Sequence, residues 1–585
     1  MNSRLSRTAD ASQARVPLCL PATCLLATCL LASGLGCGRS QPAPEPDMVL
    51  LGGKIVTVDS AFSYAEAVAI RDGKFQAVGT TATVKALAGP HTETVDLHGL
   101  TVVPGLMDNH LHNSGGGPGV DLSRARSLAD VLAAVGARVA ATPAGGVVVS
   151  NADWHEAQLR EQRLPLRRDL DTVSPDTPVV LVRGGHEYIL NTAALKKWHI
   201  DRRTPEPDGG RITRGEDGEL NGELVDRAKA LVSLAPPPVR SAEEQLQDQI
   251  AEYRTLNEAG LTSVRHPGTS VAQYRLIREL RKRGLLTMRA NVLMRPDREL
   301  DVGKFTSSLA DAGVTPDEGD EWVRIGGVKL GVDGGFEGGL MRDAYEEPWG
   351  QHGEFFGLQT MPRDRYIDIV KALNRLGWRV ATHAVGDAAM DLVLDAYDAA
   401  NAERSIAGRR WSLEHGFIAR PDHFRRLKAL DVLVAAQDHL YLAGPSLVKY
   451  WGPERAALTT PLRSYIDAGV GVSSGTDSSV VPYPPLWTFY HFVTRRTIAG
   501  TVLGPEQRIT REEALRLATI DNAYLTFEEG TKGSIEPGKL ADLVVLSDDI
   551  MTCPDGRLEQ TTALMTMVGG TIVFERDGFR AGGAR

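Results

Sequence analysis

The chain has 585 residues, and its composition of 42% hydrophobic, 24% charged and 6% aromatic residues is typical of an ordinary globular protein. Disordered, collagenous and multi-span membrane chains are thereby excluded. The 65 Lys and Arg residues against 74 Asp and Glu residues give a net charge of −9 without a basic cluster. The sequence therefore does not indicate a nucleic-acid binder and favours a small-molecule partner.

The N-terminus has the order of a signal peptide. Basic residues precede an apolar run over 16–36, which ends at Cys37, and a polar, proline-containing stretch follows. We predict a signal peptide over 1–37 and a tether over 38–47. The segment resembles a bacterial lipoprotein signal with Cys37 as the lipidated residue, so we expect an exported protein, periplasmic or anchored to a membrane. An uncleaved anchor helix is the alternative.

Both ends of the mature chain predict a small β domain. Short β-branched runs bounded by Asp-Gly, Gly-Gly and His-Gly turns fill residues 48–100, and runs of the same kind return over 523–585. The segment MVGGTIVF near the C-terminus is similar to LLGGKIVTV near the N-terminus. We therefore predict one small β-sandwich built from both segments.

Residues 101–522 alternate apolar strand-like runs with helical segments, which predicts repeated β-then-α units around a parallel sheet. Several of the apolar runs end in a polar residue, as in TVVPGLMDNHLH, WRVATHAVGD, RWSLEHG and VGVSSGTDS. Catalytic groups of a (β/α)8 barrel lie at the carboxyl ends of its strands, so we predict an α/β fold with a TIM-type (β/α)8 barrel. The segment 121–258 is too long for one β-then-α unit, and we expect an insertion there.

Histidines at the ends of the apolar runs predict a metal site. His110 and His112 share one face of an extended strand, so both imidazoles can reach one cation. His383 and His415 each end another run, and neutral imidazole is the commonest nitrogen ligand of zinc. The alternatives are surface histidines for the first pair and histidines bound to backbone carbonyls at the barrel rim for the second.

The motif PGL-x-D-x-H-x-H after a hairpin-rich N-terminus resembles the amidohydrolase superfamily of metal-dependent hydrolases. The chain is most similar to the branch that includes N-substituted formamide deformylase, through GVKLGVDGGFEGG, RVATHAVGDAAMD, WSLEHG, SSGTDSSV and GSIEPGKLADLVVL. The resemblance implies that His110, His112, His383 and His415 are metal ligands. It also implies that Asp477 contacts the metal and takes the proton of the attacking water. A turn-forming aspartate is the alternative.

Lys329 in GVKLGVD matches the strand-borne lysine that two-metal relatives carbamylate to bridge their cations. The resemblance implies one or two divalent ions, zinc first among them, with a carbamylated Lys329 if there are two. Otherwise we expect Lys329 to pair with Asp333 or Glu337 as a charge anchor.

Further side chains are expected near the site. His186 in VRGGH resembles a substrate-facing histidine, and we expect it to bind substrate. His266 and His439 also follow apolar runs, and they either orient substrate and ligands or are polar rim residues. We expect four aromatic residues either to line an apolar pocket or to belong to the core: Trp154, Tyr188, Phe336 and Trp349.

The sequence thus predicts an exported, metal-dependent hydrolase that directs an activated water at carbon–nitrogen bonds other than peptide bonds. Formamides, cyclic amides and N-acyl amines are the substrate classes that the resemblance implies, with Asp477 passing its proton to the departing nitrogen. Deamination and ester or lactone hydrolysis use the same apparatus and are alternatives. A non-catalytic cell-surface binding lipoprotein is a further alternative, against which the full set of expected histidine and aspartate positions argues.

Overall fold

The computed structural model of the chain describes residues 44–236, 239–297, 299–346, 353–480 and 484–579. The predicted signal peptide with Cys37, most of the predicted tether, and Trp349 lie outside these residues. In the described part of the chain, no helix combines the length and the apolar character needed to cross a bilayer.

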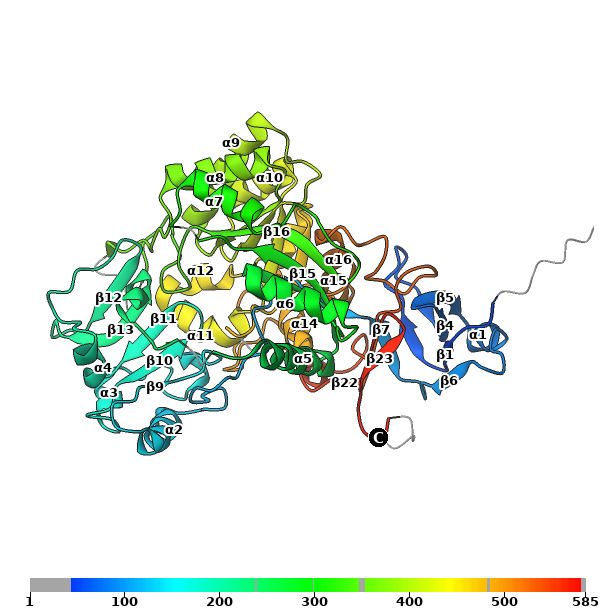
Figure 1. Cartoon of the computed structure of the whole chain (residues 1–585), viewed down its shortest axis with the longest axis horizontal. Helices are drawn as coiled ribbons and strands as arrows, with labels where there is room; N and C mark the ends of the chain where they lie inside the picture. Colours follow the sequence, from blue (N-terminus) through cyan, green and yellow to red (C-terminus); the bar gives the residue numbers. More distant parts are fainter. Residues whose placement is uncertain (1–43, 237–238, 298, 347–352, 481–483, 580–585) are drawn as a thin grey trace, which may run out of the picture. The chain divides into compact units, whose positions relative to one another are not determined.

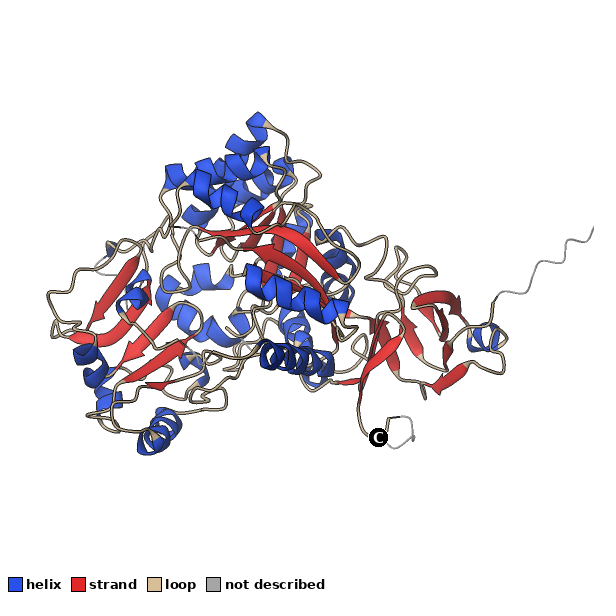
Figure 2. Ribbon diagram, in the orientation of Figure 1, coloured by secondary structure: helices blue, strands red, loops and turns tan. Residues whose placement is uncertain are grey.

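Eight parallel strands form the central sheet (Figures 1 and 2). In sheet order they are β8 (Leu106–Asp108), β14 (Leu261–Thr269), β15 (Arg289–Met294), β16 (Val323–Gly331), β17 (Val380–Ala384), β18 (Ser412–His415), β19 (Leu433–Gln437) and β20 (Val472–Gly475). The first and last strands meet at their carboxyl ends, where Asn109 N–H donates to Ser474 O at 3.1 Å and Leu111 bridges Ser478. The sheet nearly closes, and the predicted α/β barrel fold is confirmed.

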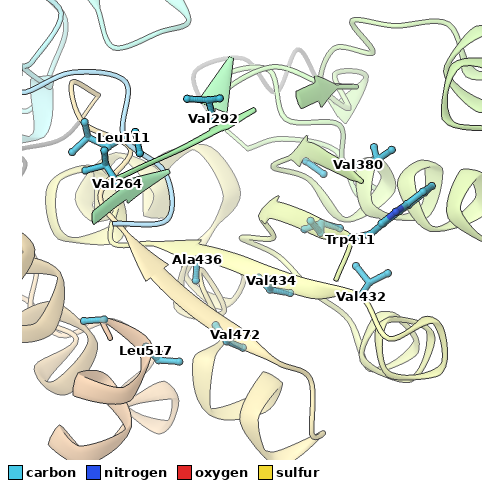
Figure 3. Packing of buried hydrophobic residues seen from close by; sticks show 14 of the residues in the cluster. Leu111, Val264, Val292, Val380, Trp411, Val432, Val434, Ala436, Val472 and Leu517 are labelled. Atoms are coloured by element: carbon cyan, nitrogen blue, oxygen red, sulfur yellow. The ribbon is translucent and has the colours of Figure 1, made fainter. Parts of the chain in front are cut away.

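Amphipathic helices cover the outside of the barrel. In α8 (Arg363–Arg375) the buried residues Tyr366, Ile369, Val370 and Leu373 follow the three-to-four residue spacing of one helix face. They belong to one apolar cluster with strand residues such as Val380 and Val434, which Figure 3 labels among side chains of neighbouring strands. Each such aliphatic side chain contributes roughly 1.5–3 kcal/mol on burial, so this layer fixes the strand ends in space.

The helices of the barrel segment and the rest of the chain have the following bounds. They are α1 (Thr81–Lys85), α2 (Leu128–Ala141), α3 (Arg167–Asp171), α4 (Thr192–Lys197), α5 (Ala242–Glu258), α6 (Val271–Lys282), α7 (Val302–Asp311), α9 (Asp387–Glu403), α10 (Pro421–Leu430), α11 (Leu440–Trp451), α12 (Pro453–Ala457), α13 (Leu462–Asp467), α14 (Pro485–Thr494), α15 (Arg511–Leu517), α16 (Ile520–Leu525) and α17 (Asp555–Leu558).

Two further sheets lie near the ends of the chain in sequence, and the six-stranded one combines strands from both ends. The four-stranded sheet has the order β5-β4-β1-β6, with β5 (Lys74–Gly79), β4 (Ala67–Arg71), β1 (Met48–Leu51) and β6 (Glu93–Asp96). The six-stranded sheet has the order β23-β22-β21-β7-β2-β3, with β23 (Thr571–Glu575), β22 (Ala563–Val568), β21 (Leu543–Leu546), β7 (Thr101–Pro104), β2 (Lys54–Val56) and β3 (Tyr64–Ala65). One apolar cluster joins Leu50 and Val68 of the first sheet to Val102 and Leu543 of the second, so both chain ends share a core.

The chain passes from the small sheets to the barrel at Gly105. Strand β7 pairs with the C-terminal strand β21, so residues 101–104 belong to the six-stranded sheet, although the predicted barrel segment begins at 101. A Cβ at Gly105 would overlap the side chain of Thr262. The bare glycine therefore allows the chain to run directly from β7 into the first barrel strand.

A five-stranded sheet lies between β8 and β14, inside the range where an insertion is expected. Its order is β12-β13-β11-β10-β9, with β12 (Gly210–Arg214), β13 (Leu220–Asp226), β11 (Glu187–Leu190), β10 (Val179–Arg183) and β9 (Val148–Val149). Helix α5 forms the last part of the range expected for the insertion, and it contacts β14, β22 and β23. That helix is thus part of the barrel's outer layer rather than of the inserted sheet.

A buried ion pair joins the barrel to the six-stranded sheet. Arg289, at the start of β15, donates from Nε and Nη2 to the two carboxylate oxygens of Asp542 at 2.7 and 3.0 Å. Asp542 directly precedes β21 and also accepts the N–H of Gly569 at 2.7 Å. The guanidinium carbon of Arg289 lies 4.5 Å from the centroid of the Trp322 ring, so both charges are fully partnered.

Removal of one partner of this pair should destabilise the protein. We expect Asp542→Ala to lower the free energy of unfolding by about 3–5 kcal/mol, because Arg289 is left charged and buried. Urea unfolding measures the change. The control is Asp248→Ala, which breaks the exposed ion pair with Arg240 and should cost at most about 1 kcal/mol. Equal midpoints for the two variants would contradict this assignment.

Candidate active site at the barrel mouth

The carboxyl ends of the barrel strands open into a cavity of about 440 Å3, a size typical of small-molecule sites. All seven side chains predicted for the site line it: His110, His112, His186, Lys329, His383, His415 and Asp477. The structure thus brings together residues from five barrel strands and the inserted sheet.

The metal-ligand candidates form one compact group. Ligand atoms of His110, His415 and Asp477 all lie within 4.8 Å of one another. The Nζ atom of Lys329 is 3.3 Å from His110 Nε2, and His112 Nε2 is 3.2 Å from Asp477 Oδ1. The rings of His383 and His415 have centroids 4.5 Å apart. Imidazole and carboxylate at this spacing are the donor set of a divalent metal site.

Hydrogen bonds fix which nitrogen each buried histidine presents. Nδ1 of His110 donates to Glu414 Oε2 at 2.7 Å, and Nδ1 of His415 donates to Gln437 Oε1 at 2.6 Å, which leaves Nε2 of both rings available. Nε2 of His383 donates to the carbonyl of Gly334 at 3.1 Å and leaves Nδ1 available. A ring that donates one N–H to a carboxylate or carbonyl is the usual state of a metal-binding histidine, so these residues fit a metal.

Two site residues have left-handed backbone conformations. His415 has φ 73° at the end of β18, and Asp477 has φ 56° after β20. Neighbouring side chains of a regular strand point to opposite faces. At His415 the chain departs from the strand geometry, and both Glu414 and the His415 ring lie close to His110. Such conformations cost about 1–3 kcal/mol, which the surrounding barrel must offset.

Burial keeps the histidines neutral. Burial, together with the charge of Lys329, lowers the pKa of His110 to about 4. Burial likewise lowers the pKa values of His383 and His415 well below the usual histidine value, with neighbouring histidines adding to the effect. Neutral imidazole is the form that binds metal, so the site is in its ligating state at neutral pH.

Asp477 is ionised and Lys329 is an unusually weak base. Burial raises the pKa of Asp477, but interaction with the nearby His110, His112 and His439 rings lowers it by more, and the net pKa lies well below the usual value. Burial lowers the pKa of Lys329 to about 8. A substantial neutral fraction of this amine is therefore present near neutral pH.

Neither expected charge anchor is the partner of Lys329. Asp333 accepts backbone N–H groups of Leu340, Val385 and Gly386, and Glu337 pairs with Arg183. The carboxylate in range of Lys329 Nζ is instead Glu414, at 4.0 Å.

His266 and His439 have orienting contacts. Nδ1 of His266 donates to the carbonyl of Leu111 at 3.0 Å, and this bond holds the backbone between His110 and His112. Nε2 of His439 lies 3.2 Å from Asp477 Oδ2. His439 therefore contacts a metal-ligand candidate itself, and His266 holds the backbone between two of them, so neither lies at a bare rim.

A smaller, apolar cavity of about 40 Å3 adjoins the main one. It is lined by His383, His415 and His439 and by a wall of aromatic side chains. The wall includes Trp154 and Phe336, as expected, and Phe417, which the sequence did not single out. Tyr188 instead lies on β11 under the Lys229 ammonium, 5.2 Å from its ring centroid.

The comparisons with known proteins agree with this site. Residues 93–574 match the amidohydrolase family. The chain belongs to the amidohydrolase family. It is 32% identical to N-substituted formamide deformylase of Arthrobacter pascens, across 91% of this chain and 99% of that protein. It is 30% identical to Protein LONG AFTER FAR-RED 3 of Arabidopsis thaliana, across 90% and 91% of the two chains.

Among solved structures, an uncharacterized metal-dependent hydrolase from Pyrococcus furiosus is 25% identical, with a TM-score of 0.62 over 86% of this chain and all of that one. These likenesses confirm the resemblance to amidohydrolases and the hydrolase class predicted from the sequence.

Sequence reasoning missed the residues that orient this amidohydrolase's ligands. Glu414 directly precedes His415 in LEHG, and a carboxylate next to a ligand histidine was a usable signal. Gln437 ends its apolar run just as the ligands do, so the same strand-end criterion applied to an amide would have found it. Asp226, which contacts His186, carries no local signal.

The hydrogen bond from His415 to Gln437 should contribute to metal binding. We expect Gln437→Met, which keeps the side-chain length but removes the acceptor, to weaken zinc binding about 10–100-fold because the His415 ring is no longer oriented. Competition with a chromogenic chelator measures the affinity. Gln245→Met, on the exposed face of α5, is the control. An unchanged zinc affinity in Gln437→Met would show that the bond does not orient the ligand.

Proposed function

We propose that this amidohydrolase hydrolyses the C–N bond of N-substituted formamides and related N-acyl amines. The observation that carries the proposal is the complete donor set around Asp477 at the mouth of the barrel. The likeness to N-substituted formamide deformylase, which covers 99% of that enzyme, supports the substrate class.

One or two divalent ions, with zinc as the first candidate, fit the donor set. We propose that His110, His112, His383, His415 and Asp477 would hold these ions, and that a carbamate on Lys329 would be a further ligand if there are two. Carbon dioxide reacts with a neutral amine, and the pKa of about 8 for Lys329 supplies that form. When bound, such ions supply Lewis-acid activation of water and of the substrate carbonyl.

The side chains of the site perform the proton transfers. The Asp477 carboxylate accepts a proton from the attacking water, whose oxygen bonds to the formyl carbon. The C–N bond breaks, and the nitrogen gains the proton that the water lost. The products are formate and an amine, and Asp477 returns to its ionised form. His439, whose Nε2 lies 3.2 Å from Asp477 Oδ2, keeps the carboxylate aimed at the ligand group.

Product analysis on a panel of substrates tests the proposal. We expect the zinc-loaded protein to release formate and amine from N-alkylformamides, and Asp477→Asn to lower kcat by about 10²–10⁴-fold because the proton acceptor is lost. His383→Ala should have a comparable effect while the protein stays folded by circular dichroism. Turnover of lactones or aminopurines without turnover of formamides would contradict the proposal. It would favour lactone hydrolysis or deamination instead.

Metal content tests the role of Lys329. We expect two zinc ions per chain after purification with bicarbonate, and fewer than two in Lys329→Met, since the methionine cannot form a carbamate. Elemental mass spectrometry gives the stoichiometry, and ¹³C-bicarbonate labels the carbamate for NMR. The same metal content in both proteins, or no carbamate signal, would remove Lys329 from the metal site.

A further inference from the structure

His186 is placed between the two cavities of the site. It lines both the main cavity and the small apolar one, and its side chain is 33% exposed. Its ring stacks on that of His383, with centroids 5.5 Å apart and planes at 27°. The imidazole therefore lines the same cavity as the metal-ligand candidates.

Asp226 holds His186 by two bonds. The backbone N–H of Asp226 donates to the carbonyl of His186 at 2.8 Å, and Nδ1 of His186 lies 2.5 Å from Asp226 Oδ1. The register of β11 and β13, in which Glu187 faces Val225, places the two residues side by side. A carboxylate can only accept, so the proton between them is carried by Nδ1 of His186.

The other ring nitrogen of His186 is consequently an acceptor in the neutral ring. Nε2 carries a lone pair when Nδ1 carries the proton. Within the described part of the chain, Nε2 has no hydrogen-bond partner. The cavity thus presents an unused acceptor beside His383.

Three glycines after β16 make room for this arrangement. A Cβ at Gly334 or at Gly338 would overlap Asp226 Oδ2, and a Cβ at Gly335 would lie 2.6 Å from Cγ of His186. Asp226 itself has φ 48°, a conformation that residues with a side chain rarely adopt. The carbonyl of Gly334 also accepts from His383, so one glycine turn positions both the metal-ligand candidate and the His186–Asp226 pair.

We infer that Asp226 fixes the tautomer of His186 so that Nε2 accepts a hydrogen bond from the N–H of the substrate amide. Substrates are then amides that carry an N–H, such as mono-N-substituted formamides, whereas N,N-disubstituted amides and esters lack the required donor. This inference rests on the proposed amide hydrolysis and names the substrate class within it. His186 contacts the substrate, and Asp226 is a positioning residue that acts through His186.

The test compares one pair of substrates across variants. The value of kcat/KM is measured for N-butylformamide and N-butyl-N-methylformamide, and their ratio is the selectivity. In Asp226→Asn the side-chain amide can donate to Nδ1, which moves the ring proton to Nε2. We expect the selectivity for the N–H substrate to fall at least about tenfold in this variant, the equivalent of one lost neutral hydrogen bond. Comparing ratios cancels the intrinsic difference in reactivity between the two amides.

Gly335→Ala provides a second, independent variant, because the added Cβ displaces the His186 ring while the Asp226 side chain keeps its carboxylate. We expect the same fall in selectivity. Gly530→Ala, where an added Cβ meets nothing within 4 Å, is the control and should keep the wild-type ratio. Zinc content and Tm of each variant separate a change in recognition from a loss of folding, since a merely structural defect lowers both rates together.

An unchanged ratio in both variants, or equal turnover of the two formamides by the wild-type protein, overturns the inference. If the wild-type protein cleaves neither formamide, the proposed function fails, and calorimetric binding of the same two compounds decides the inference instead. Tighter binding of the N–H compound that is lost in Asp226→Asn supports an N–H acceptor; equal binding overturns it.

Discussion

The site depends on one carboxylate buried inside the barrel. Glu414, fully buried on β18, accepts from His110 Nδ1 on the first strand, from Arg265 Nη1 at 2.9 Å on the second, and from Ser412 Oγ at 2.6 Å. Burial raises the pKa of Glu414, but the charges of Arg265 and Lys329 lower that pKa by a larger amount. Glu414 therefore stays ionised. An isolated buried carboxylate costs several kcal/mol, and Arg265 offsets that cost. The ligand geometry around His110 is thus set by the protein itself.

Much of this arrangement could be predicted from the sequence because it depends on residues that lie close together along the chain. Strand runs that end in His110, His383 or Asp477 predict side chains that converge at one edge of a parallel barrel, whatever the loop structure. The turn-rich segments at both ends predict hairpins by their glycines. For these features, the spacing of apolar and polar residues along a few positions is sufficient.

The orientation of the ligands could not be read in the same way. Which nitrogen His383 presents depends on the Gly334 carbonyl, 49 positions away, and the position of His186 depends on the register of two strands in the inserted sheet. Asp226 ends its strand in the sequence LVDRAK, where a carboxylate has many ordinary uses. Contacts that arise from tertiary register leave no local pattern, so side-chain identities predicted which residues line the cavity but not their partners.

The six-stranded sheet also dictates an order of events during biosynthesis. Strand β7 lies directly beside β21, and their residues 101–104 and 543–546 are separated by most of the chain. While the protein is being made, β7 lacks this neighbour until nearly the whole polypeptide has emerged. Closing so long a loop adds little to the equilibrium cost but slows folding, and an open strand edge can meanwhile pair with other chains. Because His110 follows β7 by a few residues, we expect the geometry of the candidate site to be completed only after β21 has joined the sheet.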